Sequence, residues 1–223
     1  MNGWWPLALL ALGAFTPTAH AQVPSRFGGL YAGVEGGPVS YNTRITFDGV
    51  DDPAGRGGAV YGVALGYLRP LGRWVLGLET TLGSATVPDP YTFDPSVTGF
   101  AELDLRRERG VSLAGRAGRV VAERLLVHGS IGYARATQSV RLDGVRLSEY
   151  GGSGDVTFGT LLLGAGIEVG VATRLGLRFD FRSLGGHDLS ADDFGSVVPD
   201  AGLTFLDVEP GQHRLTFGVR YRL

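Results

Sequence analysis

The chain of 223 residues contains no cysteine and no lysine, and after its amino-terminal segment it has no long apolar run. Without cysteine no disulfide framework can hold it together. No later segment approaches the roughly 20 consecutive apolar residues of a membrane-spanning helix, and none keeps the 3.6-residue apolar period of a long amphipathic helix. The formal net charge of −2 provides no basic field for nucleic acid. These absences argue against a helical membrane protein, a helix-rich secreted enzyme and a nucleic-acid-binding protein.

The one apolar run lies at the amino terminus. Residues 7–15 are apolar but too few to cross a bilayer as a helix, and Ala19-His20-Ala21 has the small residues that precede signal cleavage. We expect residues 1–21 to be a signal peptide and residues 22–223 to be the mature domain. A disordered tail or a lipid-facing anchor is the alternative. An exported domain without disulfides must then be stabilised by its own packing or by a membrane.

What the chain has in abundance is glycine and alternating sequence. It contains 37 glycines, and 43% of its residues are hydrophobic. Residues 163–169 and 175–182 alternate strictly, with apolar residues in one phase and small or charged residues in the other. Alternation with period two predicts strands, because successive side chains point to opposite faces. A face that is fully charged, opposite a face that is fully apolar, suits a barrel with lipid outside and charges inside.

The same alternation recurs along the whole chain and predicts eight strands. They cover about residues 29–37, 59–69, 74–83, 103–121, 125–142, 163–169, 175–182 and 213–223. Three connections are tight turns, which contain Arg73, Arg124 and Arg174. The other four are long and rich in glycine and acidic residues; residues 185–212 contain six acids and no arginine.

Short turns at one end and long loops at the other are typical of a transmembrane β-barrel. The predicted fold is therefore all-β, a closed antiparallel eight-stranded transmembrane β-barrel, in which the first strand must pair with the last. The tight turns are expected in the periplasm and the long loops outside the cell. Aromatic side chains near the turns are expected to form the inner girdle; these are Tyr67, Trp74, Tyr133 and Tyr221.

A family resemblance follows from the order of several segments. They are GLYAGVEGG, LGYLRPLGRWVLGLE, SLAGRAGRVVAERLLVHGSIGYA, GAGIEVGVATRLGLRFDFRSLG and the ending HRLTFGVRYRL. Together they resemble the small porin-like surface proteins of Gram-negative bacteria that have an OmpA-like eight-stranded barrel domain. The chain departs from the family pattern at Leu223, where phenylalanine is usual, and at Arg119, where a girdle tyrosine is common. The resemblance implies an outer membrane location, contact with membrane lipid and lipopolysaccharide, and insertion by the barrel assembly machinery through the carboxy-terminal strand.

The charged residues in the inward phase are the candidate site. They are Glu35, Glu79, Arg116, Glu168, Arg178, Asp180, Arg182 and Arg220. An eight-stranded barrel is just wide enough for side chains to fill it, and an unpaired buried ion costs several kcal/mol. These residues form either an ion path or a polar plug whose charges satisfy one another. Barrel width favours the plug.

Two other groups of residues could carry chemistry. His128 and Ser130 lie in one phase of a strand and resemble the pair of outer membrane lipid A deacylases, or they simply occupy the barrel interior. Asp188, Asp192 and Asp193 could bind a divalent cation, although a solvated acidic loop explains them as well. No motif for zinc, an EF-hand or a phosphate-binding loop is present, so no cofactor and no catalytic residue is expected.

Two functions from different classes remain. The first is a structural barrel that supports the envelope and presents surface loops, for which the sequence indicates no specific ligand. The alternative is a narrow porin for ions or small solutes. A lipid A deacylase is a distant third.

Overall fold

The computed structural model describes residues 26–47, 50–86, 91–92, 102–143, 152–185 and 206–223. Eight long strands account for most of them: β1 (Gly29–Phe47), β2 (Val50–Leu71), β3 (Trp74–Thr86), β5 (Glu102–Ala122), β6 (Leu125–Asp143), β7 (Gly152–Gly170), β8 (Leu175–Leu184) and β9 (Leu206–Arg222). A two-residue strand, β4 (Tyr91–Thr92), pairs with the upper end of β5. No helix in these ranges is long and apolar enough to cross a membrane.

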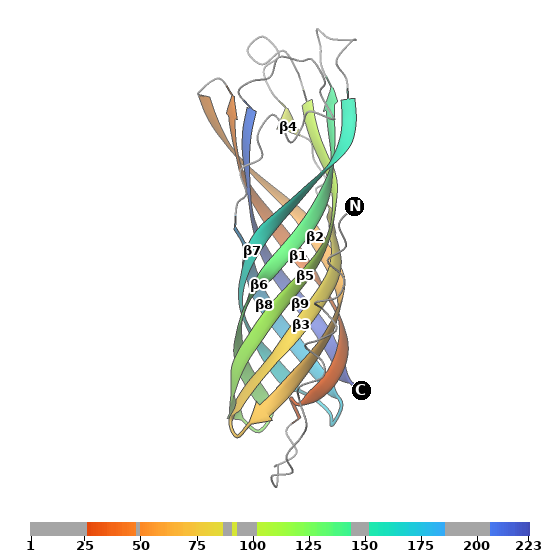
Figure 1. Cartoon of the computed structure of the whole chain (residues 1–223), viewed down its shortest axis with the longest axis vertical. Helices are drawn as coiled ribbons and strands as arrows, with labels where there is room; N and C mark the ends of the chain where they lie inside the picture. Colours follow the sequence, from red (N-terminus) through yellow and green to blue (C-terminus); the bar gives the residue numbers. More distant parts are fainter. Residues whose placement is uncertain (1–25, 48–49, 87–90, 93–101, 144–151, 186–205) are drawn as a thin grey trace, which may run out of the picture.

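The eight long strands form one closed antiparallel barrel (Figure 1). Each strand pairs with its neighbours in chain order, and two further pairings complete the ring. β3 pairs with β5 across the outlying β4, and β1 pairs with β9. The prediction of a closed barrel in which the first and last strands meet is confirmed.

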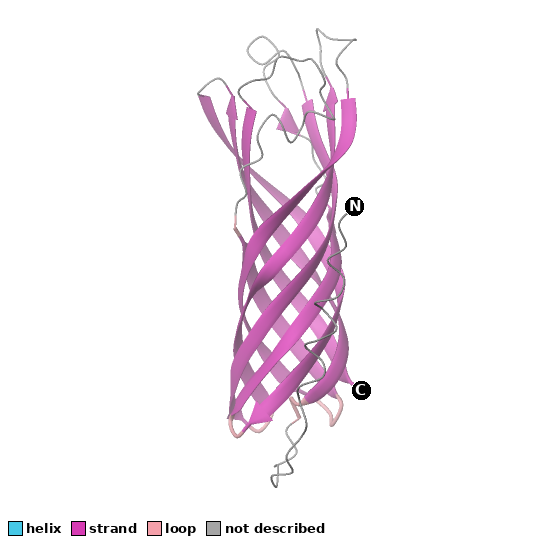
Figure 2. Cartoon of the chain, viewed as in Figure 1, coloured by secondary structure: helices cyan, strands magenta, loops and turns pink. Residues whose placement is uncertain are grey.

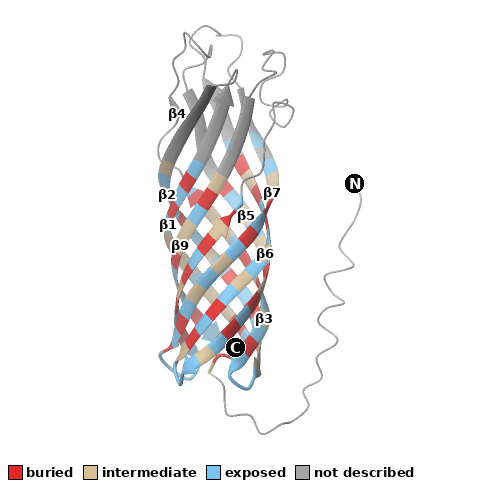
Figure 3. Ribbon diagram, turned by 90° about the vertical axis from the view of Figure 1, so that its left-hand side faces the viewer, coloured by how far each residue is buried: buried red, intermediate tan, exposed pale blue. Residues whose placement is uncertain are grey.

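The alternation of side chains explains why these residues form a barrel wall rather than a soluble sheet. On β8, Leu177 and Phe181 are exposed, whereas Arg178, Asp180 and Arg182 are buried. The alternation of buried and exposed positions runs along the described strands (Figure 3). The apolar face of the wall therefore points away from the protein, and the charged face points into the barrel.

The tight turns lie together at one end of the barrel (Figure 2). In the first turn Gly72 has a φ of 63°, a left-handed conformation that favours glycine. Each turn arginine accepts a hydrogen bond through its carbonyl oxygen from a neighbouring hairpin: Arg73 from Val120, Arg124 from Gly170 and Arg174 from Arg222, all at 2.8 Å. These bonds link the three turns in series and connect the last one to the end of β9.

The strands are longer than predicted. β1 continues to Phe47 and β2 begins at Val50, where the sequence suggested a loop over residues 38–57. β7 begins at Gly152, well before residue 163, where the sequence placed the start of the corresponding strand. A strand needs only about 9–11 residues to span a bilayer. The apolar alternation stops at the membrane boundary, but the hydrogen-bonded ladder continues beyond it.

One aromatic assignment also changes. Tyr67, Trp74 and Tyr221 are exposed on the outer wall near the turns. Tyr133 is exposed as well, but it lies opposite Leu113 and Leu161. It stands roughly 27 Å along the strand from Leu125, so its place in the turn-side girdle was wrong. Arg119, at a position where tyrosine is common, lies over the Trp74 ring at 5.9 Å.

Candidate functional site

Six strands direct charged side chains into one region of the barrel interior. We call this group the lumen ionic cluster. It contains four carboxylates and four guanidinium groups, so its formal charges balance: Glu35 on β1, Glu79 on β3, Arg116 on β5, Glu168 on β7, Arg178, Asp180 and Arg182 on β8, and Arg220 on β9. Their side chains are at most 8% exposed, so each charge depends on a partner within the barrel.

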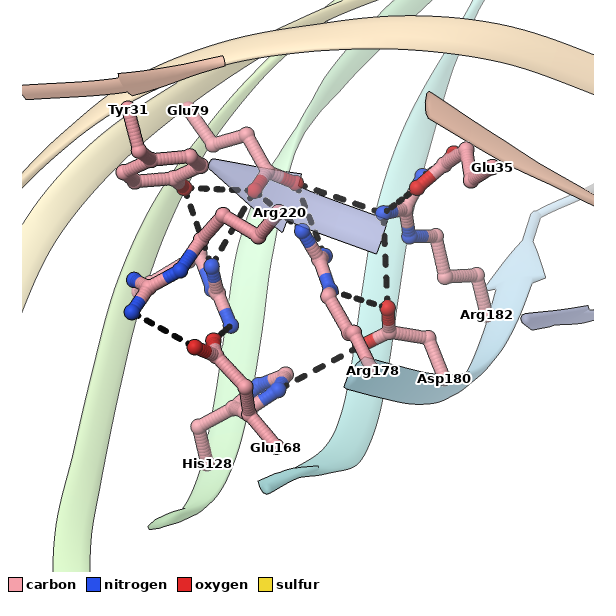
Figure 4. A network of polar contacts seen from close by, with 10 residues as sticks. Tyr31, Glu35, Glu79, His128, Glu168, Arg178, Asp180, Arg182 and Arg220 are labelled. Atoms are coloured by element: carbon pink, nitrogen blue, oxygen red, sulfur yellow. Dashed lines mark hydrogen bonds and ion pairs between the residues drawn. The ribbon is translucent and has the colours of Figure 1, made fainter. Parts of the chain in front are cut away.

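Glu79 is the hub of the lumen ionic cluster (Figure 4). Its carboxylate accepts hydrogen bonds from Arg116 at 3.1 Å and Arg182 at 3.2 Å. Arg178 donates from both terminal nitrogens, one of them at 2.8 Å. The phenol of Tyr31 donates at 2.6 Å. One carboxylate on β3 thereby connects β1, β5 and β8 across the lumen.

Glu168 has different partners from those its register suggests. Arg178 is its direct neighbour on β8, but the Arg178 guanidinium extends to Glu79 and Asp180. Glu168 instead lies 2.6 Å from Arg220 and 3.8 Å from Arg116. Its side chain is 0% exposed, and neither carboxylate oxygen has a contact with hydrogen-bond geometry. Charge attraction, rather than directed hydrogen bonding, therefore holds this residue.

The other two carboxylates of the cluster, Glu35 and Asp180, both lie near Arg182. Arg182 donates two hydrogen bonds to Glu35, at 2.6 and 2.9 Å, in the bidentate arrangement that suits a guanidinium and a carboxylate. Asp180 lies 3.8 Å from the same arginine and 3.4 Å from Nε2 of His128. All eight predicted residues thus share one connected set of ion pairs.

An apolar layer lies beside the cluster, toward the turns. Phe27, Tyr31, Leu68, Val75 and Leu126 pack together, and each is 1% exposed. The Arg220 guanidinium of the cluster lies against this layer, 4.8 Å from the Tyr31 ring centre and 5.9 Å from that of Phe27. Phe27 precedes β1 and was not recognised from the sequence, because it lies outside any alternating run.

A second polar group, the mouth cluster, lies toward the loops. It consists of Tyr41, Glu108, Gln212 and Arg214. The Glu108 carboxylate accepts from Arg214 at 2.5 Å, from Gln212 at 2.8 Å and from Tyr41 at 3.3 Å. Glu108 and Arg214 have the same phase as Arg116 and Arg220 on their strands, so the alternation contained the signal for them. A small cavity between the two clusters is lined by residues that include Glu35, Arg182, Glu108 and Arg214.

Of the other candidate residues, the structure describes His128 and Ser130. His128 is buried against Asp180, three residues from the start of β6 and therefore near the turns. Ser130 lies opposite Arg116 and Gly164. In the ranges that the structure describes, no three histidine or acidic side chains could hold a metal ion. Asp188, Asp192 and Asp193 fall outside those ranges, as does the expected signal peptide.

Comparisons with known proteins agree with this architecture. Residues 7–222 match the family described as the outer membrane protein beta-barrel domain. The chain is similar to the crystal structure of Neisserial surface protein A, with 13% identity, a TM-score of 0.51, and coverage of 87% of this chain and 97% of that one. It is also similar to outer membrane protein OprG from Pseudomonas aeruginosa, with 13% identity, a TM-score of 0.52, and coverage of 88% and 98%. No curated protein matches the sequence. At these identities the solved structures show the fold alone.

Proposed function

The chain belongs to the outer membrane protein beta-barrel domain family, and on that premise we propose that it is a non-conducting structural barrel that presents loops at the cell surface. Its location is the outer membrane of a Gram-negative bacterium, where lipid and lipopolysaccharide surround the apolar wall. The observation that carries the proposal is the charge-balanced lumen ionic cluster, which joins six strands through side chains that are almost fully buried.

Two further features of the interior support a closed lumen over a narrow pore. The apolar layer around Phe27 and Leu68 lies on the turn side of the cluster. The mouth cluster around Glu108 lies on the other side. An ion crossing the barrel would have to displace paired charges and then enter an apolar layer, and both steps are costly for an ion without its hydration shell.

The test of this proposal is single-channel recording from refolded protein in planar bilayers. We expect no steady current at the level of a water-filled channel. A variant with Arg178, Phe27 and Leu68 all replaced by alanine should conduct, because it removes side chains from the charged cluster and from the apolar layer together. A variant with three outward residues replaced by alanine, Leu78, Leu113 and Ile131, is the matched control and should stay silent. Steady current through the unmutated protein would reject the closed lumen and establish the pore.

Two further parts of the proposal concern biogenesis. Residues 1–21 act as the signal peptide and residues 22–223 form the mature barrel domain. β9 is the segment that the barrel assembly machinery engages. Before β1 and β9 pair, β9 has a free edge of backbone N–H and C=O groups that can pair with another strand. Deletion of residues 213–223 should then abolish insertion, as detected by loss of the protein from outer membrane fractions.

A further inference from the structure

Outward-facing side chains change from apolar to positively charged at one level of the barrel. On β5, Val111 and Leu113 are exposed apolar residues, and the next outward residue toward the loops is Arg109. On β6, Ile131 and Tyr133 are followed in the same way by Arg135. The apolar belt that contacts lipid therefore ends, on these two neighbouring strands, with two arginines.

The register places the two arginines side by side. Arg109 lies opposite Thr137, and Arg135 lies opposite Val111. The two positions are thus diagonal neighbours on one face, roughly 7–8 Å apart. Both side chains are long enough to reach a common group from that spacing.

Hydroxyl groups surround the arginine pair. Ser84 lies opposite Arg109 on the β3 side, where its hydroxyl donates a hydrogen bond to the Glu108 carbonyl oxygen at 2.8 Å. Thr137 and Thr157 share a hydrogen bond of 2.8 Å on the β7 side. These residues and the two arginines line a shallow groove on the outer wall, with Leu82 at its apolar edge. Guanidinium and hydroxyl groups together are suited to the oxygens of a phosphate group.

The charges of the arginine pair lie on the outer face of the wall. In the part of the chain that the structure describes, no ion pair involves Arg109 or Arg135, in contrast to the arginines of the lumen. Asp155, an acidic residue on the same face, lies two residues beyond Thr157 toward the loops. Its carboxylate accepts a hydrogen bond from Ser139 at 2.8 Å. Among the described residues, the two positive charges at the edge of the belt therefore have no neutralising partner.

Below the arginine pair, the wall offers an aromatic residue at headgroup level and an apolar surface for acyl chains. The Tyr133 ring crosses from β6 to β7 and covers Gly159, where an added Cβ would overlap the phenol. An aromatic side chain with a polar tip at the belt edge is typical of the headgroup level of a membrane. A ligand here would place acyl chains against Val111 and Leu113 and its anionic group against the arginines.

We propose that Arg109 and Arg135 form a binding site for a phosphate group of lipid A, the phosphorylated glycolipid anchor of lipopolysaccharide in the outer leaflet. The proposal goes beyond the structural role above, and it requires the loop end of the barrel to face outside. In the outer leaflet the belt edge coincides with the layer of lipid A phosphates. Each guanidinium can donate two hydrogen bonds to phosphate oxygens.

The test uses full-length mature protein refolded in detergent, with bound lipid counted by native mass spectrometry. The probes are bisphosphorylated lipid A and the same lipid without phosphates. Arg109→Gln and Arg135→Gln should each weaken lipid A binding about tenfold or more, the loss expected for a charge-assisted contact. Arg119→Gln is the matched control, because it removes the same charge from the same face of β5 at the opposite belt edge. Heat-dependent migration on gels verifies that each variant is folded.

Four results would overturn the proposal. They are unchanged binding in the double variant, an equal loss in Arg119→Gln, equal affinity for the dephosphorylated lipid, and displacement of lipid A by inorganic phosphate at equal concentration. The last result would identify a site for free phosphate. Because binding in detergent needs no membrane orientation, failure here is distinct from an inverted barrel, which labelling of intact cells detects.

Discussion

Glu168 allows the pairing inside the lumen to be measured. Its carboxylate is 0% exposed, 2.6 Å from Arg220 and 3.8 Å from Arg116. Coulomb energy falls inversely with distance, so at equal dielectric the Arg220 contact is about one and a half times as strong. Glu168→Gln leaves Arg220 buried without its partner, which should lower the free energy of unfolding by about 3–5 kcal/mol. Arg220→Met should cost a similar amount, because it leaves Glu168 with only the longer contact.

The double variant should cost less than the sum of the single variants. Removing both partners leaves no stranded charge, and we expect a coupling energy of about 1–3 kcal/mol. The assay is urea unfolding of refolded protein in lipid vesicles, with folded protein followed by gel migration. Arg220→Met also removes the contact with the Tyr31 ring. This loss cancels in the coupling energy, because it occurs both in the unmutated protein and in the Glu168→Gln variant.

The control is a second cycle between Glu168→Gln and Arg182→Met. Arg182 pairs with Glu35, Glu79 and Asp180 but has no contact with Glu168. Its coupling to Glu168 should be within about 0.5 kcal/mol of zero. Additive losses in the Glu168–Arg220 cycle, or equal coupling in both cycles, would refute the assigned pairing.

Three further predictions concern the barrel as a whole. Unboiled protein in detergent should migrate differently from boiled protein, because all strands of a closed barrel separate together; identical migration with a helical circular dichroism spectrum would contradict the fold. In intact cells an impermeant thiol reagent should label cysteine introduced at Asp155 but not at Thr173, and the reverse pattern would show that the orientation is wrong. Gly66→Ala should lower the free energy of unfolding by about 1–3 kcal/mol, because the added methyl would overlap the phenol of Tyr31; Gly57→Ala, which meets open space, is the control, and equal effects would argue against close packing at Gly66.

Strand phase is the property of this fold that sequence predicts best. Every outward residue in the membrane must be compatible with lipid, so alternation identifies the two faces of β8 without any knowledge of its neighbours. The tight turns can be predicted for the same reason, because the alternation of apolar residues is interrupted where the chain reverses direction. The upper parts of β1, β2 and β7 could not be located in this way. Beyond the membrane both faces meet polar surroundings, and the hydrogen-bonded ladder leaves no mark in hydropathy.

Partner choice inside the lumen was also beyond the sequence. Glu168 and Arg178 are adjacent by register, yet Arg178 reaches Glu79 across the barrel. Long side chains in a narrow lumen contact strands far apart in the ring, so pairing depends on rotamers rather than on strand order. Phe27 was missed for a different reason, because it enters the barrel from the segment before β1 rather than from a strand.

The two-faced wall also has a consequence for how the chain travels. A protein of the outer membrane must first cross the inner membrane, where a run of about 20 apolar residues would halt and integrate as a helix. In β8 each lipid-facing residue, such as Leu177, is followed by one destined for the interior, such as Arg178. Only a paired, closed barrel collects these residues into an apolar surface. The unfolded chain can therefore cross the inner membrane without being retained there as a helix, and it becomes a membrane protein only when it folds in the outer membrane.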